Sequence, residues 1–239
     1  MMNLLSHRST EIEIMDDLSC KGSVVEQTLK ELAFINRWLG GNKVTLGGIQ
    51  QLLSANDSGQ EIRITDIGCG GGDILKQIAD WGVKRGFNLK LLGIDANPYI
   101  VEFAKAQYKA LTQIDFKVQN VESREFQESE TDIYIATLFT HHFSNDQLTE
   151  LFQIMHKQSR IGVVINDLHR HWIAYCSIWI LTRLFSRSRM VKFDAPLSVR
   201  RSFSRGELGQ ILHKAGINNY SLRWKWAFRW QLIIPSSLA

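Results

Sequence analysis

The amino-terminal part of the chain has the apolar spacing of helices. Over residues 24–39 apolar side chains recur every three or four positions, and Gly40 and Gly41 then interrupt the pattern. A shorter apolar repeat covers residues 45–53, and the small and polar residues 54–59 that follow have the composition of a surface loop. We therefore expect two helices and a loop before the first strand.

From residue 62 onward, short β-branched runs alternate with longer helical repeats. The short runs predict buried parallel strands, and the longer repeats predict helices that cover both faces of one sheet. The expected strands are 62–67, 89–94, 116–118, 132–138 and 161–165, and the expected helices are 73–85, 98–110, 145–158 and about 207–215. In such a sheet, ligands bind beyond the carboxyl ends of the strands.

Two later segments add less regular features. The apolar run 172–185 is shorter than the about 20 residues that span a bilayer, and its basic flank predicts a helix that lies over a pocket or on a membrane surface. Aromatic residues then alternate with polar and basic ones at Trp224, Trp226, Phe228 and Trp230. This alternation favours a final antiparallel strand over an array that stacks nucleic-acid bases.

Composition narrows the class of protein. A chain of 239 residues can bury one good core, and with 3 prolines there is no rigid linker, so we expect one α/β domain with small additions. The three cysteines are far apart and form no CxxC pair, which indicates a reducing compartment rather than a disulfide framework. Acidic residues from Glu11 onward interrupt any signal peptide, so the expected location is the cytoplasm.

The net charge of +4 is unevenly distributed. Basic side chains crowd one region, at Arg183, Arg187, Arg189, Lys192, Arg200, Arg201 and Arg205. Such a region can meet nucleic acid, an anionic substrate or a membrane surface, and it can equally be a solvated face.

A loop almost without side chains, residues 68–72, joins the first strand to its helix. Glycine lets the backbone turn tightly and lets a ligand approach the main chain, while the helix amino terminus favours a carboxylate. A dinucleotide site needs glycine where Asp73 stands, which argues against NAD. Asp95 ends the second strand, where its carboxylate can accept hydrogen bonds from ribose hydroxyls. Its alternative role as a helix cap is better filled by Asn97.

These residues resemble a known family. Residues 66–72 (DIGCGGG) look like the first motif of the class I S-adenosylmethionine-dependent methyltransferases, and 93–95 (GID) look like the second. The resemblance covers about residues 60–170. It implies a Rossmann-like fold with a mostly parallel seven-stranded sheet, helices on both faces, amino-terminal helices and an inserted helical lid. The implied domains are a helical cap, 1–58, and a methyltransferase domain, 59–239, with its insertion at about 170–198.

The same resemblance implies where S-adenosyl-L-methionine binds. Asp66 and the glycines would contact its methionine part, and Asp95 its ribose. Many relatives carry an acidic residue after the third strand, but residues 119–122 read Gln-Asn-Val-Glu, so the adenine contact is Asn120 or the main chain near Val121. The expected cofactor-binding residues are Asp66, Gly68, Cys69, Gly70, Gly72, Asp95, Ala96, Asn120, Val121 and Thr137.

Further motifs indicate a small-molecule acceptor. Residues 137–143 (TLFTHHF) resemble the Leu-His-His-Phe element of ubiquinone-biosynthesis-type methyltransferases. Residues 15–17, 35–41 and 194–203 resemble methyltransferases encoded beside type III polyketide synthases, which implies a phenolic, quinone-like or polyketide-derived acceptor, aromatic with a lipid-like tail. Peripheral membrane contact fits such an acceptor, and nucleic acid fits it poorly.

Methylation of a phenol hydroxyl benefits from a base, because a phenol has a pKa of about 10 whereas histidine titrates near 6.5. His169 is the first candidate and His142 the second, since both follow strand ends, and His171 is the third. The alternative for each is a buried or capping histidine. A metal site made of His141, His142, His169 and His171 is disfavoured, because no paired cysteine or suitably spaced carboxylate accompanies them, and no metal is expected.

Two other functions stay open at this point. The basic region could serve an RNA methyltransferase, whose binding would fall steeply with salt. A cofactor-binding domain without catalysis would keep the same glycine loop, and the oligomeric state is not indicated.

Overall fold

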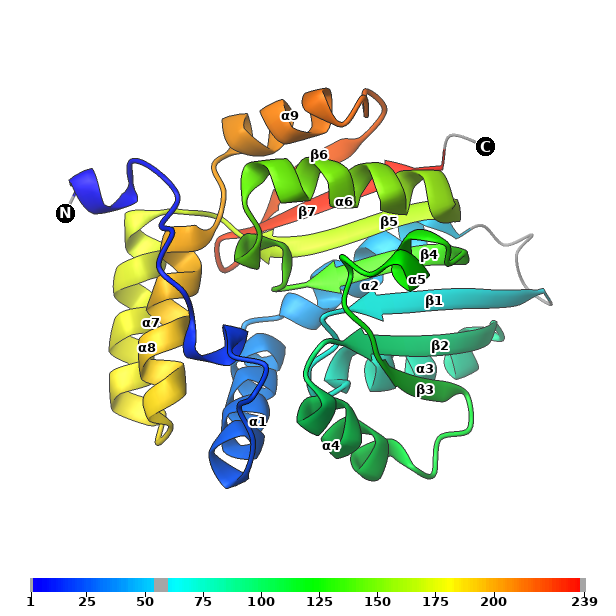
Figure 1. The fold of residues 1–239 in the computed structure, drawn as a ribbon, viewed down its shortest axis with the longest axis horizontal. Coiled ribbons are helices and arrows are strands. Elements are labelled where there is room, and N and C mark those ends of the chain that lie inside the picture. The colour runs from blue at the N-terminus through cyan, green and yellow to red at the C-terminus, as the bar shows by residue number, and fades with distance from the viewer. Residues whose placement is uncertain (1, 54–59, 237–239) are drawn as a thin grey trace.

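A seven-stranded sheet forms the centre of the computed structural model, which describes residues 2–53 and 60–236 (Figure 1). The strand order is β3-β2-β1-β4-β5-β7-β6; β1 to β5 are parallel, and β7 is antiparallel to β5 and β6. The strands are β1 Glu61–Ile67, β2 Asn88–Asp95, β3 Ile114–Val118, β4 Thr131–Thr137, β5 Ser159–Leu168, β6 Ser221–Lys225 and β7 Arg229–Pro235. The expected mostly parallel seven-stranded sheet is confirmed, while the expected loop 54–59 lies outside the described residues.

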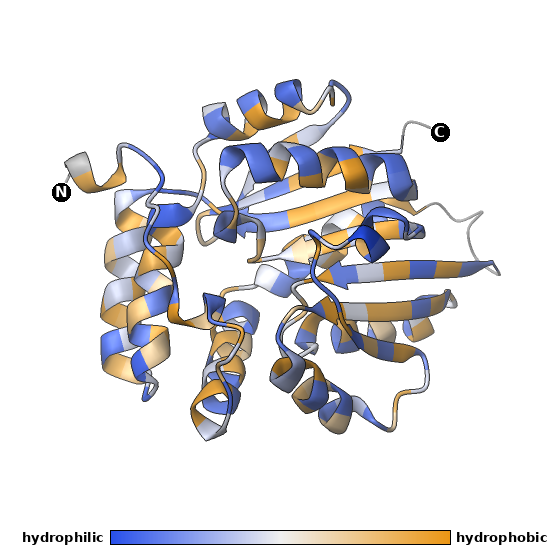
Figure 2. Cartoon of the chain, in the orientation of Figure 1, coloured by the Kyte–Doolittle hydropathy of each residue, from blue (hydrophilic) through white to orange (hydrophobic). Residues whose placement is uncertain are grey.

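Helices cover both faces of the sheet, as the pattern predicts. The helices are α1 Ser23–Trp38, α2 Gly41–Leu52, α3 Asp73–Arg85, α4 Pro98–Tyr108, α5 Arg124–Gln127, α6 Asn145–Gln158, α7 Trp172–Phe185, α8 Arg189–Arg201 and α9 Arg205–Lys214, with short 3-10 turns η1 Met2–Leu5, η2 Ile14–Asp16 and η4 Thr140–His142. One apolar core lies between the sheet and α6 and α9, and a second lies between the sheet and α2, α3 and α4. Orange apolar segments accordingly fill the centre of the sheet in Figure 2.

Local capping explains where several helices begin. Asn97 accepts a hydrogen bond from the backbone N–H of Tyr99 at 2.9 Å, and Pro98 occupies the first helical position of α4. Ser144 begins α6 with a reciprocal capping box to Gln147, and α9 begins with the same arrangement. The cap at Asn97 leaves the carboxylate of Asp95 available for another role.

Three elements differ from the sequence-based expectation: α2, β5 and α8. Helix α2 begins at Gly41 rather than at 45, because only Gly40 adopts the left-handed conformation that ends α1, with φ 74°. Strand β5 runs on to Leu168, since β7 pairs with it from residue 162 to 168. The pattern predicts no separate helix over α8, whose interior holds Pro196. Burial of five other apolar side chains of α8 outweighs the cost of that proline.

The expected final antiparallel strand is confirmed as β7, but the aromatic residues extend over a hairpin of two strands, β6 and β7. Trp224 of β6 pairs with Trp230 of β7, and Trp226 and Phe228 lie in the turn between them. Ala227 and Phe228 take positive φ values of 59° and 53° there. The aromatic alternation therefore runs around a turn instead of along one strand.

The amino-terminal segment lies along α8. Backbone N–H groups of Ile14 and Met15 donate to the carboxylate of Asp194 at 2.8 and 3.1 Å, and Arg200 forms an ion pair with Glu11 at 2.8 Å. Part of the basic region is thus used to hold the amino terminus rather than exposed for an anionic partner.

Helix α2 packs against β5 and β7. Helices α7 and α8, which follow β5 in the sequence, lie side by side at one edge of the molecule (Figure 1). The division into a cap, 1–58, and a domain, 59–239, stays a prediction. None of the helices in the described ranges has the length and apolar run needed to cross a membrane.

Candidate active site

A cavity of about 870 Å³ lies at the carboxyl ends of the parallel strands. Its floor comes from the segments after β1, β2, β3 and β4, and its walls come from α1, α7 and the β6–β7 turn. Most of the lining is apolar. The volume lies toward the upper end of the roughly 300–1,000 Å³ typical of ligand pockets, which is room for two ligands side by side.

The glycine loop forms a bare part of this floor for steric reasons. Gly68 and Gly70 have φ values of 65° and 51°, in the left-handed region. A Cβ on Gly68 would lie 2.0 Å from Cδ2 of Phe139. A side chain at this position would therefore displace the segment after β4 as well as strain the turn.

Nine of the ten expected cofactor residues line the cavity, and Gly72 does not. Gly72 instead begins α3 with φ 78°, and a Cβ there would lie 2.6 Å from Cζ of Phe116. Its role is to let the loop pack against β3. The packing thus explains why glycine stands at this position, and the contact of Gly72 with the cofactor stays a prediction.

Asp66 presents a buried carboxylate without partners. The residue is 1% exposed, and neither carboxylate oxygen has a hydrogen-bond donor among the described residues. Burial, together with the nearby charges of Asp73 and Asp95, raises its pKa well above the usual value. An uncompensated buried carboxylate is costly, so a cationic ligand group in the cavity would stabilise it.

Asp95 is held in place by the main chain. Its Oδ1 accepts a hydrogen bond from the N–H of Asn97 at 3.0 Å, and its Oδ2 accepts one from Gly70 at 3.1 Å. Burial raises its pKa, while these backbone donors oppose the rise. Each oxygen keeps a lone pair that can accept a further hydrogen bond, so the fixed carboxylate can bind two hydroxyl groups.

The segment after β3 offers a residue that the pattern did not single out. Gln119 is buried against the cavity, and its Nε2 has no partner in the described part of the chain. Asn120 is exposed, and its Oδ1 accepts the backbone N–H of Glu122 at 2.9 Å. The free amide donor therefore belongs to Gln119.

Cys69 is a packing residue, as expected. Burial and the nearby charges of Asp66 and Asp95 raise the pKa of its thiol well above the usual value, which keeps it protonated. A Cβ on Gly93 would lie 2.9 Å from its Sγ, so that glycine provides the space in which the thiol packs.

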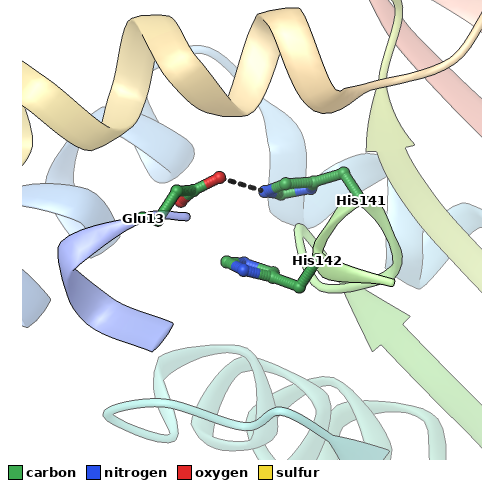
Figure 3. Close-up of side chains that lie close together, drawn as sticks. All are labelled: Glu13, His141 and His142. Carbon is green, nitrogen blue, oxygen red and sulfur yellow. Dashed lines mark ion pairs between the residues drawn. The ribbon is translucent and has the colours of Figure 1, made fainter. Parts of the chain in front are cut away.

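Two histidines after β4 meet a glutamate from the amino-terminal segment (Figure 3). Nδ1 of His141 lies 2.7 Å from Oδ1 of Asp167, and its Nε2 lies 3.6 Å from Oε1 of Glu13. Both His141 and Glu13 are buried in the cavity wall. Burial raises the pKa of Glu13 to about 7, and its Oε1 lacks a hydrogen bond. His141 and Glu13 thus line the cavity and Asp167 orients His141, and the sequence pattern gave none of the three a role toward the cofactor or acceptor.

His142, the second expected base, lines the cavity. Its Nδ1 lies 2.5 Å from Oδ1 of Asp16, and Arg201 donates to the other oxygen of that carboxylate at 2.6 Å. Burial raises the pKa of Asp16, but the contacts with His142 and Arg201 outweigh it and hold the pKa well below its usual range. An ionised carboxylate only accepts hydrogen bonds, so Nδ1 of His142 carries a proton and donates it to Asp16.

His169, the first expected base, does not line the cavity. Its ring packs 4.9 Å from that of Trp230 and 5.4 Å from that of His171. Strand β5 extends to Leu168, so His169 lies beside the β6–β7 hairpin instead of facing a ligand. His171 caps α7 by accepting a hydrogen bond from the N–H of Ile173 at 3.2 Å. Of the two expected bases, His142 therefore lines the cavity and His169 does not.

Within the described ranges, one cluster of side chains could bind a metal ion. It is not the set of four histidines considered in the sequence. The ligand atoms of Glu13, His141 and His142 lie within 4.8 Å of one another. Nε of Arg201 lies 3.8 Å from Oε1 of Glu13, so a fixed positive charge already faces this carboxylate. The arrangement does not favour a second cation there.

Residues with strained backbone conformations also line the cavity. Among the described residues, the three non-glycine positions with positive φ are Leu138, Ala227 and Phe228, and all three line it. Strained conformations of this kind cluster at functional sites.

Comparison with known proteins agrees with this geometry. Residues 64–162 match a family model described as a methyltransferase domain. No curated protein matches the sequence. Human N-acetylserotonin methyltransferase, solved in complex with SAM, superposes with a TM-score of 0.62 at 14% identity, over 90% of this chain and 56% of that one. This chain thus spans little more than half the length of the human protein.

Two further solved structures are similar over more of their length. An O-methyltransferase family protein from Burkholderia thailandensis superposes with a TM-score of 0.64 at 13% identity, over 99% of this chain and 67% of that one. The plantazolicin methyltransferase BpumL, solved with a desmethylPZN analog and SAH, superposes with a TM-score of 0.62 at 16% identity, over 89% of each chain. The chain thus has the fold of the solved class I methyltransferases, and its residues 64–162 resemble a methyltransferase domain.

Proposed function

We propose that this protein transfers a methyl group from S-adenosylmethionine to a hydroxyl oxygen of a small, largely apolar acceptor. The observation that carries the proposal is the carboxylate of Asp66, buried beside a bare glycine loop with both oxygens free. The ammonium group of the cofactor's methionine part is a suitable partner for this carboxylate. The donor supplies an activated methyl group, and the protein supplies alignment and exclusion of water.

The remaining cofactor contacts follow from the fixed groups on the cavity floor. The carboxylate of Asp95 is oriented by Gly70 and Asn97 to accept the two ribose hydroxyls. The free amide of Gln119 is placed to donate to the adenine ring, with the main chain near Val121 beside it. These donors and acceptors match the polar groups at the two ends of the nucleoside.

The walls of the cavity support an apolar acceptor. Helix α7 lines it along one face, through Ile173, Ala174, Ser177, Ile178 and Leu181. The last turn of α7 leaves Leu184 and Phe185 exposed, at 69% and 77%. An aromatic compound with a lipid-like tail fits such a wall, and the exposed end of the helix suits contact with a membrane surface that holds this compound.

The base in this proposal is His142. A hydroxyl oxygen must lose its proton during methylation, and the neutral form of His142, oriented through Nδ1, would accept that proton on Nε2. Asp16 and Arg201 orient it from behind. His142 also lies close enough to Asp95 to influence the pKa of that carboxylate, so the base is near the cofactor end of the cavity.

The test is a transfer assay with methyl-labelled S-adenosylmethionine and a panel of alkyl phenols, quinols, fatty acids and RNA. We expect label in the phenolic or quinol fraction, as a methyl ether. Label confined to RNA, with transfer that falls steeply with salt, would contradict the proposal and favour the nucleic-acid alternative. Tight binding of the cofactor with no transfer to any class would favour a domain without catalysis.

A further inference from the structure

Arg229, the first residue of β7, carries a buried charge that the protein itself barely pairs. The residue is 2% exposed and lines the cavity. Its Nη1 donates one long hydrogen bond to Oδ1 of Asn166, at 3.4 Å, and its Nε has no partner in the described part of the chain. Burial lowers its pKa to about 10 although the charge of Asp167 raises it, so the guanidinium stays protonated at neutral pH.

Other buried arginines of the protein are fully engaged. Arg170 donates to the carbonyl oxygens of Leu5 and Ser202 at 3.0 and 2.5 Å, and it forms an ion pair with Glu207 at 2.7 Å. Arg201 is paired in the same way with Asp16. A buried charge that lacks hydrogen bonds has a high desolvation cost. A ligand that supplied hydrogen-bond acceptors to Arg229 would reduce this cost.

The surroundings of Arg229 fix its position. Asn166 donates to the carbonyl oxygen of Gly41 at 2.9 Å and to the hydroxyl of Thr45 at 3.0 Å, which anchors the one acceptor that holds the guanidinium. A Cβ on Gly41 would lie 2.7 Å from Cζ of Arg229 and 1.9 Å from Oδ1 of Asn36. Glycine at this position therefore lets the guanidinium and that amide pack together against the start of α2.

The position is linked to the cofactor end of the cavity. The amide of Asn36 donates to Asn42, whose own amide donates to Asp73 at 3.3 Å. Asp73 also lines the cavity, and its charge contributes to the raised pKa of Asp66. The lining of the cavity thus includes acidic groups and a buried guanidinium that are linked through Asn36 and Asn42.

We propose that Arg229 binds a carboxylate of a ligand in this cavity, through two parallel N–H···O hydrogen bonds. A guanidinium pairs with a carboxylate in this bidentate way, and a single cation within mostly apolar walls suits a monoanion better than a phosphate. The inference rests on the proposed function, which offers two sources: the carboxylate of the cofactor's methionine part, or an acidic acceptor.

The experiment compares matched ligands that differ only in the carboxylate. Calorimetry would measure the binding of S-adenosylhomocysteine and of its decarboxylated analogue, and then of an aromatic carboxylic acid and its amide. The variants are Arg229→Gln and Arg229→Met, with Arg223→Gln on exposed β6 as the control. Thermal unfolding without ligand checks the fold, and we expect both Arg229 variants to be at least as stable as the wild type because the unpaired buried charge is gone.

If the cofactor is the partner, wild type binds S-adenosylhomocysteine at least tenfold more tightly than the decarboxylated analogue, and Arg229→Gln removes that difference. If the acceptor is the partner, the affinity for S-adenosylhomocysteine is unchanged, but the preference for acid over amide is lost. Equal affinities of wild type and Arg229→Gln for both ligand pairs would overturn the inference while leaving the proposed function intact. Failure of wild type to bind either nucleoside would overturn both.

Discussion

Oδ2 of Asp95 accepts a hydrogen bond from the backbone N–H of Gly70 at 3.1 Å. This contact joins the end of β2 to the glycine loop after β1, so the two sequence motifs form one structural unit. A ligand that binds one motif therefore meets the other in a fixed orientation.

Replacing Asp95 tests this unit. We expect Asp95→Ala to weaken S-adenosylhomocysteine binding at least tenfold, because two hydrogen bonds to a charged group, each worth about 1.5–3 kcal/mol, are lost. Calorimetry measures the affinity, and circular dichroism checks the fold. Asp95→Asn is the matched control. Its amide oxygen still accepts a hydrogen bond from one hydroxyl, so its affinity for S-adenosylhomocysteine should lie between those of the wild type and Asp95→Ala. Wild-type affinity in Asp95→Ala would remove the ribose assignment.

The glycine loop allows a paired substitution. Gly68→Ala should lower both the melting temperature and the affinity for S-adenosylhomocysteine, because φ is 65° and the new Cβ would lie 2.0 Å from Phe139. Gly206→Ala, in α9 with nothing within 4 Å of the new Cβ, should stabilise the protein by about 0.5–1 kcal/mol and leave binding unchanged. Similar behaviour of the two variants would show that the loop is not sterically constrained.

The base assignment predicts a kinetic effect without a binding effect. His142→Ala should lower turnover by about 10²- to 10⁴-fold, since proton removal contributes that much, and should leave cofactor affinity within about twofold. His213→Ala, at the exposed end of α9, is the control and should behave as wild type. His169→Ala is informative as well. A large loss of turnover in that variant alone would restore His169 as the base.

The raised pKa of Glu13 predicts how the free energy of unfolding depends on pH. Its pKa rises from about 4.5 to about 7 on folding, so the folded protein holds this proton more tightly than the unfolded chain. The stabilisation is complete below about pH 4.5 and is lost as the pH rises through about 7. At most it amounts to a few kcal/mol, on the order of 1.4 kcal/mol for each pKa unit.

Thermal unfolding between pH 5 and pH 8 measures this effect. Glu13→Gln keeps the shape and removes the titration, so its melting temperature should fall less than that of wild type as the pH rises. Glu150→Gln, on the exposed side of α6, is the control and should follow wild type. Parallel curves for wild type and Glu13→Gln would mean that Glu13 does not titrate in this range.

Substitutions at two leucines of α7 should distinguish a residue that contacts the acceptor from a residue on the protein surface. Leu181 lines the cavity, whereas Leu184 is 69% exposed. Leu181→Asn should raise KM for an apolar acceptor several-fold with little change in cofactor affinity, because a polar group then faces the ligand. Leu184→Asn should leave turnover of a soluble acceptor unchanged. Equal effects on KM would contradict the proposed position of the acceptor.

Local patterns were sufficient to predict most of the fold. Helices α3, α6 and α7 begin and end where the apolar spacing places them, since each carries its own cap and amphipathic face. The end of β5 and the helix α8 depend on distant partners, β7 for the first and the packing of α7 and α1 for the second. A pattern confined to one segment contains no information about such partners.

The residues of the candidate site also divide into those with a local sequence signal and those that distant segments bring to the cavity. The glycine loop and Asp95 are local signals at strand ends, and nine of the ten expected cofactor residues line the cavity. Glu13 reaches the cavity only because the amino-terminal segment folds back along α8, and Arg229 because β7 lies beside β5. His169 looked equivalent to His142 because both follow strands, but the direction of each side chain depends on the tertiary contacts.

The most direct measurement is a calorimetric titration of the wild-type protein with S-adenosylhomocysteine, repeated with Asp66→Asn. The free carboxylate of Asp66 beside the glycine loop predicts saturable one-site binding, and loss of that charge should weaken it at least tenfold. Absence of binding heat from a folded wild-type sample, or equal affinity in Asp66→Asn, would contradict the central role of this carboxylate.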